Sequence, residues 1–200
     1  MSTRPPATDI GLFGEPLPEH YLITPEPGAD IAAFLARLDA ALAAGIRLVQ
    51  LRTKSLDAAA YATLARDATD ICHAHGARLI LNGPLTDPDA VSADGVHLGS
   101  ARLLASTTRP LAMTKLVSAA CHTARELAHA ESIGVDFVTL SPVSTTATHP
   151  DAVPLGWDRF AELATSVHTP VYALGGMTKR DVVRARSYGA CGIAAIRDLW

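Results

Sequence analysis

Three strong polar side chains alternate with apolar ones in the segment LVQLRTKSLD, residues 48–57. Successive side chains of a β-strand point to opposite faces, so Gln50, Arg52 and Lys54 are expected on one face of a strand. A guanidinium and an ammonium inside a protein need carboxylates or a bound anion as partners. Few acidic residues stand at the ends of the other apolar segments, so this face predicts a phosphate or pyrophosphate site rather than a salt-bridge network.

Other residues able to do chemistry also come at the ends of apolar segments. Gly175 and Gly176 end such a segment just before a predicted helix, a pattern typical of phosphate sites in barrels. His97 is interpreted as a packed histidine that bonds a backbone carbonyl. The remaining candidates at segment ends are Asn82, His122, Ser141, Thr145, Thr146 and Thr148.

These candidates depend on strands that alternate with helices. The predicted strands cover residues 20–25, 47–53, 78–83, 95–99, 112–120, 136–143, 171–176 and 191–196. Helices are predicted over 30–44, 57–75, 124–133, 157–167 and 178–188, with shorter segments between other strands. Mostly apolar strands alternating with helices indicate a parallel sheet, and eight units predict a (β/α)8 TIM barrel with a short or missing final helix. A doubly wound open sheet is the alternative, weakened because no GxGxxG motif follows the first strand.

The bulk composition fits one domain of this kind. Of the 200 residues, 48% are hydrophobic, which is enough for a sizeable core. Residues 1–19 contain four prolines and little periodicity, and are predicted to be an N-terminal arm or linker ahead of a barrel over 20–200. An uncovered barrel side at the missing helix would favour a homodimer or another covering segment.

Charge and hydropathy exclude several classes of partner. The net charge of −3 offers no basic field for nucleic acid or an anionic membrane. No apolar run is long enough to span a bilayer, and the first twenty residues lack the apolar core of a signal peptide. Three cysteines form no disulfide framework, so a cytoplasmic location is expected.

The motifs YLIT, VQLRTK, ADGVHLG, CHTARELAHAESIGVDFVTLSPV with TTAT, PLG and ALGGM occur in this order. As an ordered set they resemble the thiamine phosphate synthase family and its TenI-type thiazole tautomerase relatives, over about residues 20–199. The resemblance implies a (β/α)8 barrel that binds a small phosphorylated thiazole or pyrimidine. Synthases of the family join an aminopyrimidine pyrophosphate to a thiazole phosphate with Mg²⁺. The resemblance places the pyrophosphate at Gln50, Arg52 and Lys54 beside Asn82, and the thiazole phosphate at Thr146, Thr148, Gly175 and Gly176.

The sequence departs from the synthase pattern at several of these places. The two positions at which synthases carry Mg²⁺-binding aspartates hold Gly83 and Arg102. Mg²⁺ requires hard oxygen ligands, so the resemblance with these departures predicts no metal cofactor. Ala120, His149 and Arg197 replace a serine, a lysine and a second serine of the synthases.

Three functions remain open. The tautomerases of the family need no Mg²⁺ and aromatise a thiazole carboxylate phosphate, using a histidine at the end of the fifth strand as acid and base. His122 occupies that position, and histidine suits proton transfer near neutral pH. A working synthase and a non-catalytic ligand-binding or partner domain are the alternatives. The same departures resemble the synthase-like domain that is fused to Nudix hydrolases in some bacterial proteins.

Overall fold

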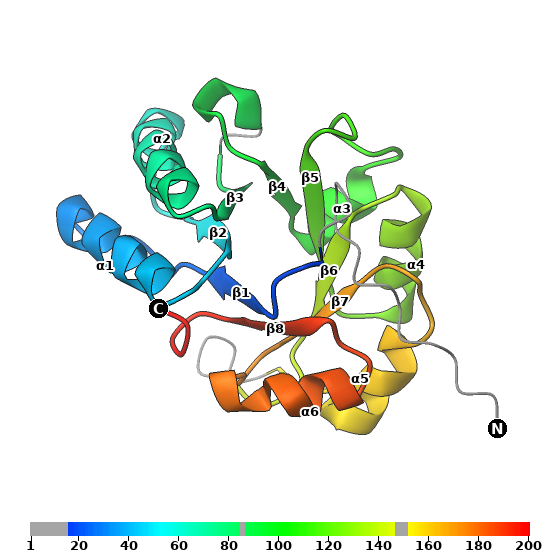
Figure 1. The fold of residues 1–200 in the computed structure, drawn as a ribbon. Coiled ribbons are helices and arrows are strands. Elements are labelled where there is room, and N and C mark those ends of the chain that lie inside the picture. Colours follow the sequence, from blue (N-terminus) through cyan, green and yellow to red (C-terminus); the bar gives the residue numbers. More distant parts are fainter. Residues whose placement is uncertain (1–15, 85–86, 147–151) are drawn as a thin grey trace.

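The chain folds into a closed barrel of eight parallel strands, with helices on its outside (Figure 1). The computed structural model describes residues 16–84, 87–146 and 152–200. Each strand pairs with the next, and β8 closes the sheet on β1 through the Tyr21–Ala194 register. The predicted TIM barrel is confirmed, and the open-sheet alternative is wrong. The strands are β1 (His20–Ile23), β2 (Leu48–Arg52), β3 (Arg78–Asn82), β4 (Gly95–Leu98), β5 (Leu116–Cys121), β6 (Phe137–Leu140), β7 (Val171–Leu174) and β8 (Gly192–Ala195).

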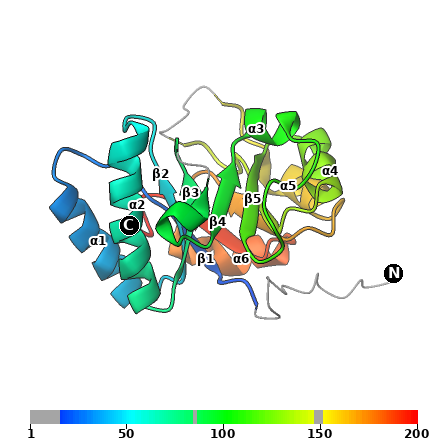
Figure 2. The same ribbon diagram turned by 90° about the horizontal axis from the view of Figure 1, so that it is seen from above.

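Helices link most of the strands and surround the barrel, as the view from above shows (Figure 2). The first two helices begin at aspartate caps, because Asp30 and Asp57 each accept a hydrogen bond from a backbone N–H three residues later. A 3₁₀ turn replaces a helix after β3, and another opens the short helix after β7. The helical elements are α1 (Ile31–Ala43), α2 (Ala58–Ala74), η2 (Pro88–Val91), α3 (Ser100–Ala105), α4 (Ala124–Ser132), α5 (Gly156–Ala164), η3 (Lys179–Asp181) and α6 (Val182–Ser187).

Within the described residues no helix follows β8, as the sequence predicts. Residues 196–200 form a turn that leads back to α1, where Figure 1 shows the C-terminal end. The Trp200 ring packs on Phe34 with centroids 4.8 Å apart, and Arg37 donates a hydrogen bond to the Trp200 carbonyl at 3.1 Å. These contacts cover part of the outer side between β8 and α1, beside a groove of about 440 Å³. The homodimer stays a prediction.

The amino-terminal end of the barrel is closed by apolar side chains. Tyr21, Phe137 and Tyr172 make mutual ring contacts inside it, with centroids 5.3–5.5 Å apart. Leu17 packs into the same cluster and is 6% exposed, and the Tyr172 hydroxyl donates to the Pro18 carbonyl at 2.6 Å. The end of the predicted arm, residues 16–19, therefore packs against the barrel.

Leu17→Ala should lower the free energy of unfolding by about 2–4 kcal/mol, because it empties part of this packed layer. The measurement is denaturant unfolding of both proteins. Leu104→Ala is the matched control, since Leu104 is 40% exposed. That change should cost less than about 0.5 kcal/mol. Equal effects of the two substitutions would show that residues 16–19 do not contribute to the barrel.

Candidate active site

A cavity of about 560 Å³ opens at the carboxyl ends of the strands. In TIM barrels this is the end at which the active site lies. The predicted site residues that line it are Gln50, Arg52, Lys54, Asn82, His122, Ser141, Thr146 and Gly175. Thr148 lies outside the described residues. Among the described residues that line the cavity there is no carboxylate, so the structure brings two cations to a site that suits an anion.

Arg52 and the loop that carries Lys54 have an acidic neighbour that the sequence interpretation missed. Glu26, in the loop after β1, lies 3.9 Å from the Arg52 guanidinium. Its carboxylate also accepts hydrogen bonds from the Thr53 hydroxyl and from the backbone N–H groups of Lys54 and Ser55, at 2.5–2.9 Å. Burial alone would raise the pKa of Glu26, but hydrogen bonds from Ser55, Thr53 and Lys54 outweigh it and lower the pKa to about 2. Glu26 thus holds the loop that carries Lys54.

Gln50 is more deeply buried than its two neighbours on the same face. It is 1% exposed, and its amide nitrogen donates to the Tyr21 hydroxyl at 2.8 Å. Its amide oxygen accepts from the Asn82 amide, also at 2.8 Å. The sequence predicts Gln50 as a ligand-binding residue alongside Arg52. The structure places it on the wall of the cavity as part of a buried hydrogen-bonded chain.

His122 sits just beyond β5, at the edge of the cavity. Its Nδ1 lies 2.8 Å from the backbone carbonyl of Ser141. A carbonyl oxygen can only accept, so Nδ1 carries the proton and Nε2 is the basic nitrogen of the neutral ring. This arrangement leaves one nitrogen of an exposed histidine available to take or give a proton.

Glu126, on the first turn of α4, fixes the loop around His122. Its carboxylate accepts from the His122 backbone N–H at 2.7 Å, from the Thr123 hydroxyl at 2.9 Å, and from the Ser100 hydroxyl. Burial opposes ionisation, but hydrogen bonds from Ser100, His122 and Thr123 outweigh it and lower the pKa of Glu126. The spacing of Thr123 and Glu126 is a capping box visible in the sequence. No pattern in the sequence indicates the hydrogen bond from Ser100 to Glu126.

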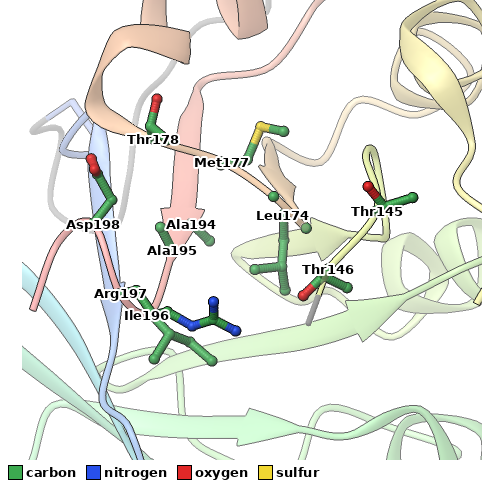
Figure 3. Close-up of a pocket in the computed structure, with 12 residues that line it drawn as sticks. Thr145, Thr146, Leu174, Met177, Thr178, Ala194, Ala195, Ile196, Arg197 and Asp198 are labelled. Atoms are coloured by element: carbon green, nitrogen blue, oxygen red, sulfur yellow. The ribbon is translucent and has the colours of Figure 1, made fainter. Parts of the chain in front are cut away.

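A second pocket, of about 360 Å³, adjoins the first at the ends of β7 and β8 (Figure 3). Gly175 and Gly176 have φ of 102° and 71°, and a Cβ on either would come within 3 Å of the backbone of the β6–α5 loop. Both positions therefore require glycine. Hydroxyls of Thr145 and Thr146 line the pocket, and the Arg197 side chain extends into it (Figure 3). The sequence presents Arg197 as a departure from the family pattern, yet it brings a cation to this pocket.

The two positions at which the family resemblance implies Mg²⁺ ligands do not fit a metal. Gly83 and Arg102 offer no side-chain oxygen, and the described residues contain no group of three His, Cys, Asp or Glu side chains that could hold a metal ion. A Cβ on Gly83 would lie 2.5 Å from the Tyr61 ring. The Tyr61 hydroxyl is held in place, because it donates to the Leu51 carbonyl at 2.9 Å and accepts from the Asn82 backbone N–H at 3.1 Å. The Tyr61 ring thus occupies the space that a carboxylate side chain at position 83 would need.

Gly83→Asp should lower the free energy of unfolding by about 1–3 kcal/mol, because the new Cβ overlaps the Tyr61 ring. Gly99→Ala is the control, since nothing lies within 4 Å of its added Cβ. In a Tyr61→Ala background the Gly83→Asp penalty should shrink, which a double-mutant cycle of unfolding free energies measures. A penalty that stays the same without the Tyr61 ring would contradict the steric explanation.

Comparison with known proteins points to one family. A family model described as thiamine monophosphate synthase matches residues 20–199. The chain is 38% identical over 178 residues to a putative thiamine-phosphate synthase of Geobacter sulfurreducens, covering 88% of this chain and 84% of that protein. It is 36% identical over 163 residues to putative thiamine-phosphate synthase 2 of Aquifex aeolicus, covering 82% and 88%.

A solved structure supports the fold assignment. A thiamine phosphate pyrophosphorylase from Pyrococcus furiosus aligns with a TM-score of 0.74 and 24% sequence identity, covering 90% of this chain and 89% of that one. At this identity the alignment shows that the two proteins share their barrel fold.

Proposed function

The chain belongs to the thiamine monophosphate synthase family, a family of thiamine biosynthesis, and from that premise we propose that it is a metal-independent enzyme that moves a proton on a thiazole phosphate. The observation that carries the proposal is the His122 imidazole. Its Nδ1 is bonded to a backbone carbonyl and its ring lines a cavity that contains two cations, with no carboxylate among the described lining residues.

The proposed reaction needs a group that both takes and returns a proton. The neutral His122 ring accepts the proton at Nε2, and the resulting imidazolium is stabilised by its Nδ1–H bond to the Ser141 carbonyl. The proton then returns to a different atom of the substrate, so the ring becomes aromatic with no change in composition. Glu126 keeps the loop at His122 in place through the backbone N–H.

The cations at the end of β2 and in the loop after it, Arg52 and Lys54, provide the charge that this substrate requires. A thiazole carboxylate phosphate carries an anionic group at each end. The carboxylate end suits Arg52 and Lys54 in the larger cavity. The phosphate end suits the adjoining pocket, where Thr146, Gly176 and Arg197 offer a hydroxyl, a backbone N–H and a guanidinium. Thr146 and Gly175 line both spaces, so one molecule can reach from one to the other.

No step of this reaction uses a divalent metal. The absence of a Mg²⁺ requirement rests on the lack of side-chain oxygens at positions 83 and 102 and on the Tyr61 ring beside Gly83.

The cytoplasmic location and the likeness to domains fused to Nudix hydrolases stay predictions. In the described part of the chain, no helix combines the length and apolarity needed to cross a bilayer.

His122→Gln should reduce turnover of the thiazole carboxylate phosphate by about 10²–10⁴-fold, because the amide cannot take up the proton. Binding of the phosphorylated thiazole, measured by calorimetry, should change little, since the phosphate contacts lie on other residues. The control is His75→Gln at the end of α2, where the ring bonds Asp39 at 2.8 Å on the outside of the barrel. Equal turnover by the His122 variant and the wild type would rule out the acid–base role.

A second candidate is synthase activity, which the names of the relatives favour. An aminopyrimidine pyrophosphate would place its anionic tail at Arg52 and Lys54. The non-catalytic alternative would keep ligand binding without any turnover.

These alternatives are separated by one assay of pyrophosphate release from the aminopyrimidine pyrophosphate and the thiazole phosphate, with Mg²⁺ and with a chelator. We expect no release that depends on Mg²⁺, because the metal donors are missing. Mg²⁺-dependent release that disappears in Arg52→Ala would establish the synthase instead. Binding of the thiazole phosphate without pyrophosphate release and without proton transfer would support the non-catalytic ligand-binding domain.

A further inference from the structure

A chain of hydrogen-bonded polar side chains, buried except for the half-buried Asn82, crosses the interior of the barrel beside the cavity. It runs from the Asn82 amide to Gln50, from Gln50 to the Tyr21 hydroxyl, and from there to Ser118 and His97. The successive distances are 2.8, 2.8, 3.5 and 2.8 Å. His97 is 4% exposed and also lines the cavity, so the chain ends at the ligand-binding space.

The direction of these hydrogen bonds assigns the proton on His97. Asn82 donates to the Gln50 oxygen, so the Gln50 nitrogen faces Tyr21 and donates to its oxygen. Burial raises the pKa of Tyr21, so its phenol keeps a proton that needs an acceptor. Among the described residues, the acceptor for the Tyr21 hydroxyl proton is Ser118 Oγ.

Ser118 in turn donates a hydrogen bond to His97. Its hydroxyl accepts from Tyr21 and is therefore free to donate to His97 Nδ1, 2.8 Å away. With Nδ1 accepting, the proton of the neutral ring lies on Nε2. Within the described residues Nε2 has no hydrogen-bond partner, so this N–H is available to a ligand.

The surroundings of His97 are positive. Arg52 pairs with Asn82, Leu81 with Val96, and His97 with Ser118, so the strand register places Arg52, Asn82 and His97 in one row across β2 to β4. Burial, followed by the charges of Arg102 and Arg52, lowers the pKa of His97 to about 3. The ring thus stays neutral near pH 7, and the same positive field favours an anionic acceptor beside it.

We propose that His97 is a specificity-determining residue that donates its Nε2–H to an anionic oxygen of the ligand, in a tautomer set by Tyr21 and Ser118. The inference rests on the proposed function, because it assumes that the anion lies at the Arg52 end of the cavity. The oxygen belongs either to a ring carboxylate or to a pyrophosphate, and the two share this recognition chemistry. His97 acts by binding, whereas His122 moves the proton.

The first test is the long-range ¹H–¹⁵N NMR spectrum of the histidine rings, with the His97 signals identified by their loss in His97→Gln. We expect the Nε2–H tautomer in the wild type and a changed tautomer population in Ser118→Ala. Ser187→Ala, at an exposed serine of α6, is the matched control and should leave the spectrum unchanged. A His97 ring found as the Nδ1–H tautomer in the wild type would overturn the assignment.

The second test is calorimetric titration with inorganic pyrophosphate and, separately, with thiazole-2-carboxylate, both in the presence of a chelator. His97→Leu should weaken binding of at least one probe about ten- to a hundredfold, the value of a hydrogen bond to a charged group. His97→Gln keeps an N–H near the Nε2 position and should restore most of that binding. A merely structural role of His97 predicts no such rescue.

The probe that loses affinity identifies the oxygen. Weaker pyrophosphate binding assigns the N–H to a phosphate, and weaker carboxylate binding assigns it to the ring substituent. Unchanged binding of both probes in a folded His97→Leu protein would overturn the proposal and leave the proposed function intact. Failure of the wild type to bind either probe would overturn the inference and the anion site together, whereas the turnover assay of His122→Gln tests the proton transfer separately.

Discussion

Closure of the parallel sheet through β1 and β8 is the constraint on which the site depends. Closure turns one face of every strand inward, into a space where water cannot satisfy buried polar groups. Aromatic and aliphatic side chains fill the amino-terminal end of that space. Polar groups gather at the other end, where each must bond to another side chain or to a ligand. The hydrogen-bonded chain from Asn82 to His97 and the cations that line the cavity are two responses to the same requirement.

Tyr61 connects the packing of the barrel with the chemistry that the site can offer. Its hydroxyl links the ends of β2 and β3, the strands that carry Arg52 and Asn82. Its ring fills the space beside Gly83 that a side chain would need. Tyr61, which belongs to helix α2 on the outside of the barrel, thereby leaves no room for a carboxylate side chain at the first position after β3. Such a site relies on guanidinium, ammonium and N–H groups to bind anions.

Two loops are organised by carboxylates that do not line the cavity. Glu26 accepts several hydrogen bonds from the loop after β2, and Glu126 joins the start of α3 to the loop after β5. Hydrogen bonds from the surrounding donors lower the pKa of both groups, so the two carboxylates stay ionised near neutral pH. Negative charge thus lies around the larger cavity, while the described groups that line this cavity are neutral or positive.

The sequence by itself determined the barrel, because apolar segments and helical periodicity recur in a regular order that closure satisfies. It also determined that Arg52, Lys54, Asn82, His122 and the paired glycines stand at strand ends, which meet at one edge of a parallel sheet. Only the tertiary structure decided which neighbours each group has. These neighbours come from residues far apart in the chain. They include the partners of Gln50, the hydrogen bond from Ser100 to Glu126, the overlap of the Tyr61 ring with position 83, and the bonds that set the proton on His97. Such contacts depend on strand register and barrel closure, which no local pattern of residues contains.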